Sequence, residues 1–421
     1  MRRVAWGLLL MFAFTIPWEY SLNLGEPWGH VARIAGILAL LAAILAVLQQ
    51  GRVRTLGPIQ WLALAFYLWI CASYFWTIAP DMTLEKMRGF FQELMIVWLV
   101  WELVESPEDV RSLMRAYVAG AWVLALLTLG SLVSGGNEVD QIRFVAEGQD
   151  ANDMARYLDL GLPMAALLLT CERRTVARIL AAGYLPLGVL AVLVTASREG
   201  FVAALIALAG CALLLYWRYR RAVVGAIALL PAIALGLSLV VPHGTVERLA
   251  TIPEELNRGD LNQRWNIWDA GWLAFVHAPL VGTGAGSFVS AAGLNPVDTA
   301  HDTALSILAD GGLVALFLAA AIVALVVRAV VQMGGPLQLA LATALLGWMT
   351  TSLVATVEEN RSTWLLIGVI AVAGRMAAEE PCAVVLCFGE SGRPAKLQER
   401  ERVANSRAGL GAIEAGETSC P

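Results

Sequence analysis

RWNIWDAGWLAFVHAPLVGTGAGSF (264–288) and HDTALSILADGG (301–312) belong to Val241–Gly312, the one long polar interruption in an otherwise almost continuously apolar chain. The apolar runs on both sides of this stretch decide the fold class, because each is long enough to cross a membrane. The polar stretch itself is where we expect any chemistry to take place.

Composition places the chain among membrane proteins. Apolar residues make up 58% of its 421 residues, charged residues make up 15%, and the mean hydropathy is +0.68. A soluble globular protein does not reach these values. The net charge of −5 says little, because the position of charges relative to the spans matters more than their sum. We expect membrane lipids as partners and no nucleic acid.

The apolar runs are about 17 to 22 residues long, which suffices to cross a hydrocarbon core of ~30 Å. The sequence therefore predicts an all-α polytopic membrane protein with about 12 transmembrane helices. The predicted spans are 4–18, 30–48, 59–78, 88–104, 111–133, 153–170, 176–195, 199–217, 222–241, 312–332, 337–356 and 362–378. The chain divides into a bundle of nine spans (1–241), a long loop with helices on the membrane surface (242–311), three further spans (312–378) and a flexible tail (379–421).

Arginine gathers in one set of connecting segments, which we assign to the cytoplasm together with both termini. These residues are Arg2, Arg3, Arg52, Arg54, Arg111, Arg115, Arg173, Arg174, Arg178, Arg218, Arg220, Arg221, Arg328 and Arg375. The opposite, outer face is predicted to hold 19–28, 77–87, 134–151, 195–200, 242–300 and 357–362, with all four histidines. Cysteines fall within spans or on the cytoplasmic side, so no disulfide framework or metal cage is indicated.

A very short outer turn, TASREGF, precedes the predicted span at 199–217. Arg198 is therefore expected at the membrane surface and at the N-terminus of a helix. Free amide donors, the helix dipole and the guanidinium together favour a phosphate or pyrophosphate there. The alternative is an interfacial arginine that only reaches lipid headgroups.

The segment LNQRWNIWDAGWLAFVHAPL places Trp265, Trp268 and Trp272 at helical spacing, and we interpret it as an amphipathic helix on the outer membrane surface. Arg264 opens this helix and either grips a lipid-linked anion or anchors the helix. The following GTGAGSF lacks the Lys and Ser/Thr of a P-loop. Its glycines at 282, 284 and 286 are interpreted as a flexible turn.

A helix is predicted from NPVDTAHDTALSILADGG, capped by Asp298 or Thr299 and bent where Gly311-Gly312 enters the membrane. His301 is then expected in the first turn, where the helix dipole lowers the pKa of its imidazole. A neutral histidine at this boundary suits a general base for a hydroxyl nucleophile. An interfacial histidine with a structural role is the alternative.

These motifs, in this order, resemble the O-antigen ligase superfamily. Ser-Arg precedes a span, Arg-x-x-x-Trp stands in a long outer loop, Pro-Leu-x-Gly-x-Gly-x-Gly-x-Phe follows, and His leads an Asp-Gly-Gly helix. The resemblance runs from about Arg88 to Arg361, and its diagnostic part lies between Thr195 and Gly312.

The resemblance implies a GT-C-like enzyme of the bacterial inner membrane with its site facing the periplasm. It would move a glycan from undecaprenyl pyrophosphate to a sugar hydroxyl of the lipid A core. His301 would deprotonate that hydroxyl, while Arg198 and Arg264 would hold the departing pyrophosphate. No metal and no cofactor are expected, and the outer loops hold no DxD pair.

Further residues of the outer face are expected to bind substrate. They are Arg88, Arg143, Asn152, Arg156, Trp268, Asp302 and Arg361. An ion pair or helix cap near the interface is the alternative for such charged groups. Asp302 stands where relatives commonly have Asn, and it could orient His301 or raise the pKa of its imidazole. Glu199 stands where a small residue is usual, and it could pair with Arg198 until substrate arrives.

Two other functions stay open at this stage. An O-antigen polymerase or a protein O-oligosaccharyltransferase of the same superfamily shares much of the topology. A lipid or glycan transporter would show internal repeats and charges at the bilayer midplane. Here no repeat is evident, and the polar residues gather at one face.

Overall fold

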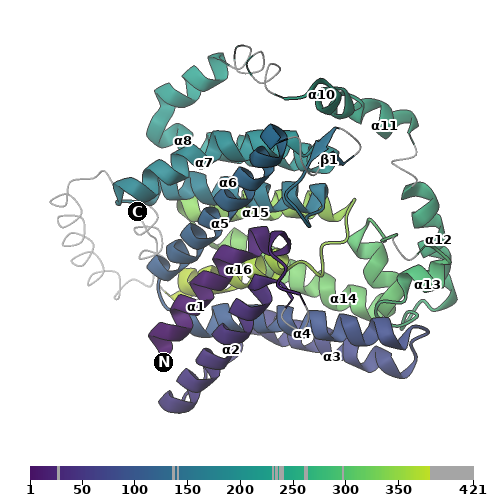
Figure 1. The fold of residues 1–421 in the computed structure, drawn as a ribbon. Coiled ribbons are helices and arrows are strands. Elements are labelled where there is room, and N and C mark those ends of the chain that lie inside the picture. The colour runs from purple at the N-terminus through teal and green to yellow at the C-terminus, as the bar shows by residue number, and fades with distance from the viewer. Residues whose placement is uncertain are drawn as a thin grey trace, which may run out of the picture.

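The computed structural model describes residues 1–25, 29–134, 138–139, 142–229, 232, 236, 241–259, 264–295 and 298–379 (Figure 1). Helices account for most of them, and the all-α polytopic membrane fold is confirmed. The helices before the long loop are α1 (Arg2–Thr15), η1 (Ile16–Ser21), α2 (Val31–Gln50), α3 (Pro58–Ala72), η2 (Ser73–Phe75), α4 (Pro80–Leu103), α5 (Pro107–Ser134), α6 (Ala151–Cys171), α7 (Thr175–Val194) and α8 (Arg198–Ala228).

The long loop carries four short helices, and three long helices follow it. These elements are α10 (His243–Ala250), α11 (Ile252–Arg258), α12 (Arg264–His277), α13 (Phe288–Ala292), α14 (Thr303–Gln332), α15 (Gly335–Ser352) and α16 (Arg361–Glu379). A two-stranded antiparallel hairpin, β1 (Glu138–Val139) and β2 (Arg143–Phe144), precedes α6.

Within the described residues, eight helices are long and apolar enough to cross a membrane. They start at Val31, Pro58, Pro107, Ala151, Thr175, Arg198, Thr303 and Arg361. The predicted total of twelve stays a prediction. The first predicted span, 4–18, falls on α1, which ends at Thr15, and on the tighter 3-10 helix η1, which continues from Ile16. That this segment spans the membrane stays a prediction.

The predicted break between spans eight and nine coincides with a kink in α8. The candidate span Arg198–Tyr216 ends just before Tyr219, whose backbone leaves the helical region, and a second helical stretch continues to Ala228. Much of the predicted ninth span, 222–241, and residues 380–421 of the predicted tail lie outside the described residues.

α6 lies at the centre of the bundle. It contacts α5, α7, α8 and α15, and 94% of its most apolar stretch is buried. Small residues permit these close crossings: a Cβ on Gly200 of α8 would lie only 2.3 Å from the Cβ of Ala155 on α6. The close crossing holds the first turn of α8, which begins with Arg198, directly against α6.

The segments predicted to share one face do meet at one end of the bundle, which we call the loop end because it carries α10 to α13 (Figure 1). Thr245 Oγ1 in α10 donates to the Ile142 carbonyl at 2.7 Å. The arginine-rich segments meet at the opposite end, where Arg54 and Arg375 both donate to the Val104 carbonyl, at 3.1 and 3.0 Å. Charge patterning thus sorted the connections correctly into two sets.

The segment predicted to be a surface helix is helical: it forms α12, which begins at Arg264, and its position on a membrane surface stays a prediction. Ile267, Gly271 and Ala274 form its buried face, and α12 contacts α13 and α14. Trp265 and Trp272 lie on the exposed face. An apolar exposed face of this kind is expected where a helix lies on a membrane surface.

Candidate functional site

A cavity of about 300 Å³ lies at the loop end, between α8 and α15 of the bundle and α10, α11 and α12 of the long loop. We call it the anion pocket. Four arginines and two glutamates line it: Arg143, Arg198, Arg248, Arg264, Glu199 and Glu255. Its apolar lining consists of Val202, Ile252, Leu353 and Val354. The formal charge of these side chains is therefore +2, beside an apolar wall.

Arg198 is the first residue of α8, as the sequence predicts. Ser197 caps the helix, since its Oγ accepts from the Gly200 amide at 3.2 Å. The Arg198 guanidinium reaches across to the loop, where it donates to Thr251 Oγ1 at 2.8 Å and pairs with Glu255 at 3.1 Å. Arg198 thus joins the bundle to α11.

Arg143 and Asn152 line the same pocket from β2 and the start of α6. Arg143 Nη2 donates to Asn152 Oδ1 at 2.8 Å, and its Nε donates to the Thr195 carbonyl at 3.2 Å. Ser197 Oγ also donates to Asn152 Oδ1, at 2.8 Å. Two residues predicted from separate segments are therefore brought together with the turn before α8.

Arg248 was missed by the sequence prediction. It lies in the last turn of α10, and its Nε donates to the Ala196 carbonyl at 3.2 Å. The only sign of it in the sequence was the polar segment 243–250, which is followed by TIPEEL (251–256). Without structure, nothing tied that helix to the turn 195–197 some fifty residues earlier.

Glu199 bridges two arginines, and the predicted pair with Arg198 is wrong. Its Oε1 accepts from Arg156, and its Oε2 lies 3.4 Å from Arg264 Nη2. Arg156 also pairs with Asp153 one turn earlier on α6. Because Arg156 is buried and doubly paired, it holds the carboxylate that in turn holds Arg264.

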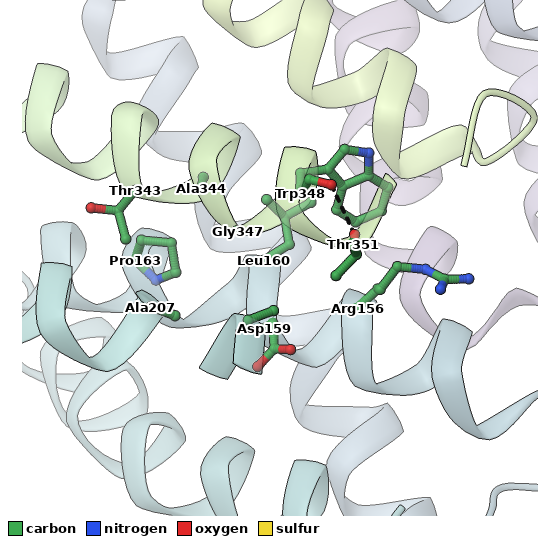
Figure 2. Close-up of a pocket in the computed structure, with 11 residues that line it drawn as sticks. Arg156, Asp159, Leu160, Pro163, Ala207, Thr343, Ala344, Gly347, Trp348 and Thr351 are labelled. Atoms are coloured by element: carbon green, nitrogen blue, oxygen red, sulfur yellow. Dashed lines mark hydrogen bonds between the residues drawn. The ribbon is translucent and has the colours of Figure 1, made fainter. Parts of the chain in front are cut away.

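Arg156 does not line the anion pocket. It borders a separate cavity of about 10 Å³ between α6, α8 and α15, which Figure 2 shows together with Asp159 and Trp348. This space suffices for about one water molecule. The two Asp159 oxygens are buried and have no hydrogen-bond partner within the part of the chain that the structure describes. Arg156 therefore acts on the pocket through Glu199.

His301 precedes α14 instead of lying in its first turn, so that prediction is wrong. Asp302 is the N-cap: its Oδ1 accepts from the Leu305 amide at 2.6 Å, and the helix begins at Thr303. Asp298 and Thr299 therefore do not cap α14. The carboxylate of Asp302 stabilises the helix start in place of the predicted contact with the imidazole.

The backbone holds His301 in an unusual conformation. His301 (φ +47°) and Ala196 (φ +52°) are the two non-glycine residues with positive φ among the described residues. One is the proposed base itself, and the other lies two residues before Arg198. Trp268 Nε1 donates to the Ala300 carbonyl at 3.1 Å and so fixes the residue before His301. Strained backbone of this kind concentrates at functional sites.

Electrostatics favour a neutral His301. Its imidazole does not line the anion pocket, yet the charge of Arg264 reaches it. Partial burial, and then the positive charge of Arg264, lower the pKa of His301 below its usual 6.5, while Asp150 and Asp298 act in the opposite sense. The shift has the predicted direction, and burial followed by Arg264 are its largest causes.

A second polar cluster, which we call the clamp, lies where the glycine turn meets α14. The Asp310 carboxylate accepts from the Gly286 amide at 2.6 Å and from the Phe288 amide at 2.8 Å. Lys86 of α4 lies 3.8 Å from Asp310 and also pairs with Glu359. The sequence prediction missed Lys86, Asp310 and Glu359.

The glycine turn is confirmed, and it is closely packed. Gly282, Gly284 and Gly286 all have positive φ, and a Cβ on Gly282 would lie 2.4 Å from the Asp310 backbone. The predicted bend of α14 is confirmed at Gly312 (φ +67°, ψ −166°). The turn and the bend together fix the part of α14 that follows His301.

Arg88 and Arg361 do not line the anion pocket, and their predicted part in substrate binding stays a prediction. The Arg88 side chain is exposed on α4. Arg361 begins α16, where it pairs with buried Glu19 of η1 and donates to Gln92 Oε1 at 3.0 Å. Its contacts are those of an ion pair that joins η1, α4 and α16.

Comparison with known proteins supports a glycan-handling enzyme. Residues 183–320, about a third of the chain, match the family model described as O-Antigen ligase. The matched segment contains Arg198, Arg248, Arg264 and His301, so most of the anion pocket and the proposed base fall inside it. The resemblance to the O-antigen ligase family is confirmed over these residues. No curated protein matches the chain.

Proposed function

We propose that this chain, whose residues 183–320 belong to the O-antigen ligase family, transfers a glycan from undecaprenyl pyrophosphate to a sugar hydroxyl of the lipid A core. The observation that carries the proposal is the anion pocket, which combines four arginines with an apolar wall. A lipid diphosphate would complement both features, because its phosphates are anionic and its lipid chain is apolar. The site would face the periplasm from the bacterial inner membrane, with both termini in the cytoplasm.

The pyrophosphate of the donor would lie among Arg143, Arg198, Arg248 and Arg264. A doubly esterified pyrophosphate carries about two negative charges, which matches the formal charge of +2 on the pocket lining. Val202 and Leu353 offer apolar surface for the first isoprene units of the carrier. Preorganised positive charge at the departing pyrophosphate would be the largest catalytic contribution.

His301 would act as the general base. Its neutral imidazole would take the proton of the acceptor hydroxyl as that oxygen bonds to the anomeric carbon. The bond between that carbon and the pyrophosphate oxygen breaks, with inversion, and the electron pair leaves on the pyrophosphate. Bound donor would also neutralise Arg264, which removes a charge that disfavours the imidazolium and makes His301 a stronger base when substrate is present.

Reconstitution with lipid-linked glycan and lipid A core tests the proposal. His301→Ala should lower kcat by about 10²- to 10⁴-fold, the usual contribution of a general base. His277→Ala is the matched control, because His277 lies in the same loop and is exposed on α12. Its activity should equal that of the wild type.

Two further arms of the same assay test the chemistry. EDTA should leave the rate unchanged, because arginines are assigned the neutralisation of the pyrophosphate. Full activity of His301→Ala would show that His301 is not the general base. Elongation of the lipid-linked glycan, with no transfer to lipid A core, would contradict the proposed acceptor and indicate a polymerase.

A further inference from the structure

A second cavity at the loop end is apolar and lies between α14, α15 and α16. Its volume is about 130 Å³, and we call it the lipid slot. Val323 of α14 and Met349 of α15 line it and are exposed at 39% and 38%, so it opens sideways between these two helices. Because α14 is long and apolar enough to cross a membrane, and 337–356 is a predicted span, we expect this opening to face lipid.

The slot runs lengthwise from the loop end into the bundle. Thr303 and Glu358 line its upper part, while Ala319 and Val326 line its lower part. Val326 follows the Gly312 bend by 14 positions in the sequence, which at ~1.5 Å per residue places it about 20 Å below the bend. This depth is at least that of one leaflet of a ~30 Å hydrocarbon core. The length of the slot suits an extended alkyl chain, of which part would lie inside the cavity.

One polar atom at the top of the slot lacks a partner. Glu358 is 93% buried; its Oε1 accepts from Ser306 at 2.7 Å, but its Oε2 has no hydrogen-bond partner among the described residues. A buried carboxyl oxygen without a partner costs free energy that a ligand would recover. A hydroxyl suits this atom whether Glu358 is ionised or protonated, because a hydroxyl both donates and accepts.

The position of the slot indicates which lipid it serves. α15 separates it from the anion pocket: Leu353 and Val354 line the pocket, whereas Trp348 and Met349 line the slot. The anion pocket has its own apolar wall for the donor lipid. The slot instead begins at Thr303, close in the sequence to the proposed base His301 and on the side of α15 away from the pocket assigned to the donor.

We propose that the lipid slot binds an acyl chain of the acceptor lipid, with a hydroxyl near the head of that chain hydrogen-bonded to Glu358. This assignment rests on the proposed function, which requires a second, acylated substrate beside His301. The slot would then set the preference of the enzyme for an acylated acceptor over the free core glycan.

Filling the slot tests the assignment. Ala319→Phe should raise the KM for intact lipid A core by about tenfold, the effect of excluding about two methylene groups. The KM for the donor, and kcat/KM with the same core after removal of its acyl chains, should not change. Ala320→Phe is the matched control, because Ala320 is the next residue of α14 and is exposed. Equal effects on both acceptors, or no effect on either, would overturn the proposal.

A binding measurement on the wild-type chain covers the case in which Ala319→Phe does not fold. Intact lipid A core with a photoreactive acyl chain should label α14 or α16 next to Ile322 or Trp364, which line the slot. Labelling there by donor lipid with a photoreactive prenyl chain, or no labelling by the acceptor, would overturn the proposal. If neither acceptor is glycosylated, the proposed function fails, while the labelling still decides whether the slot takes an acyl chain.

Discussion

The anion pocket and the clamp lie at the same end of the bundle and consist of the same kinds of side chain, yet they differ in space and in charge balance. The pocket encloses about 300 Å³, and its four arginines outnumber its two glutamates. In the clamp, Lys86 faces Asp310 and Glu359, and the adjoining cavity is about 10 Å³. Excess charge beside open space favours ligand binding, whereas paired charge without space makes the loss of either partner costly for stability.

The largest expected effect is on catalysis in the pocket. Arg264→Ala should lower kcat by about 10²- to 10³-fold, because it removes positive charge where the pyrophosphate departs. Its free energy of unfolding should change little, since Glu199 keeps its bond to Arg156. Transfer rates and thermal melting of the purified protein measure the two quantities. A lower melting temperature with kcat retained would show that Arg264 has a structural role, like the residues of the clamp.

The next effect is on stability, in the clamp. Asp310→Ala should lower the free energy of unfolding by about 3 kcal/mol, because Lys86 and the amides of Gly286 and Phe288 lose a buried partner. Thermal melting in detergent measures the loss. Asp310→Asn is the control, since it retains one accepting oxygen and should lose less. Unchanged melting of Asp310→Ala would show that the clamp does not hold the glycine turn.

A smaller effect concerns pH. Burial and the charge of Arg264 lower the pKa of His301 below 6.5, so its imidazole stays neutral until the pH falls through that lowered value. The acid limb of kcat/KM should therefore lie below pH 6.5. Arg264→Gln should move the limb upward, and Arg264→Lys should leave it in place. An acid limb above pH 6.5, or one that does not move in Arg264→Gln, would contradict this electrostatic coupling.

The smallest effect tests strained backbone beside the pocket. Ala196→Gly should change the free energy of unfolding by less than about 0.5 kcal/mol, because relief of the positive φ offsets the loss of a buried methyl group and the entropic cost of glycine. Ala209→Gly, at an exposed position inside α8, should instead destabilise by about 1 kcal/mol. Chemical denaturation of both variants measures the difference. Equal losses would show that Ala196 is not strained.

The sequence predicted the class of fold and the common end of the polar segments, because hydropathy and arginine placement report depth along the membrane normal. They do not report the direction in which a side chain points. Arg88 and Lys86 are two residues apart on α4 and so about 200° apart around the helix. Arg88 is exposed, whereas Lys86 joins the clamp.

The residues of the pocket show the same limit. Arg198 and Arg264 were predicted because each opens a helix at the surface, a position visible in local sequence. Arg248 and Glu255 were missed, because their role depends on how α10 and α11 fold back over the turn before α8. The start of α14 was misplaced because Asp298, Thr299 and Asp302 are all good caps, and the choice between them depends on tertiary contacts.

The bridge from Arg156 through Glu199 to Arg264 bears on product release under the proposed function. Arg264 has a carboxylate partner of its own in Glu199. Binding a diphosphate therefore exchanges one anion for another and gains less than the full strength of a new ion pair. The same exchange favours departure of the carrier diphosphate after transfer, because Arg264 can form its ion pair with Glu199 again. An internal competitor of this kind exchanges tight binding for turnover.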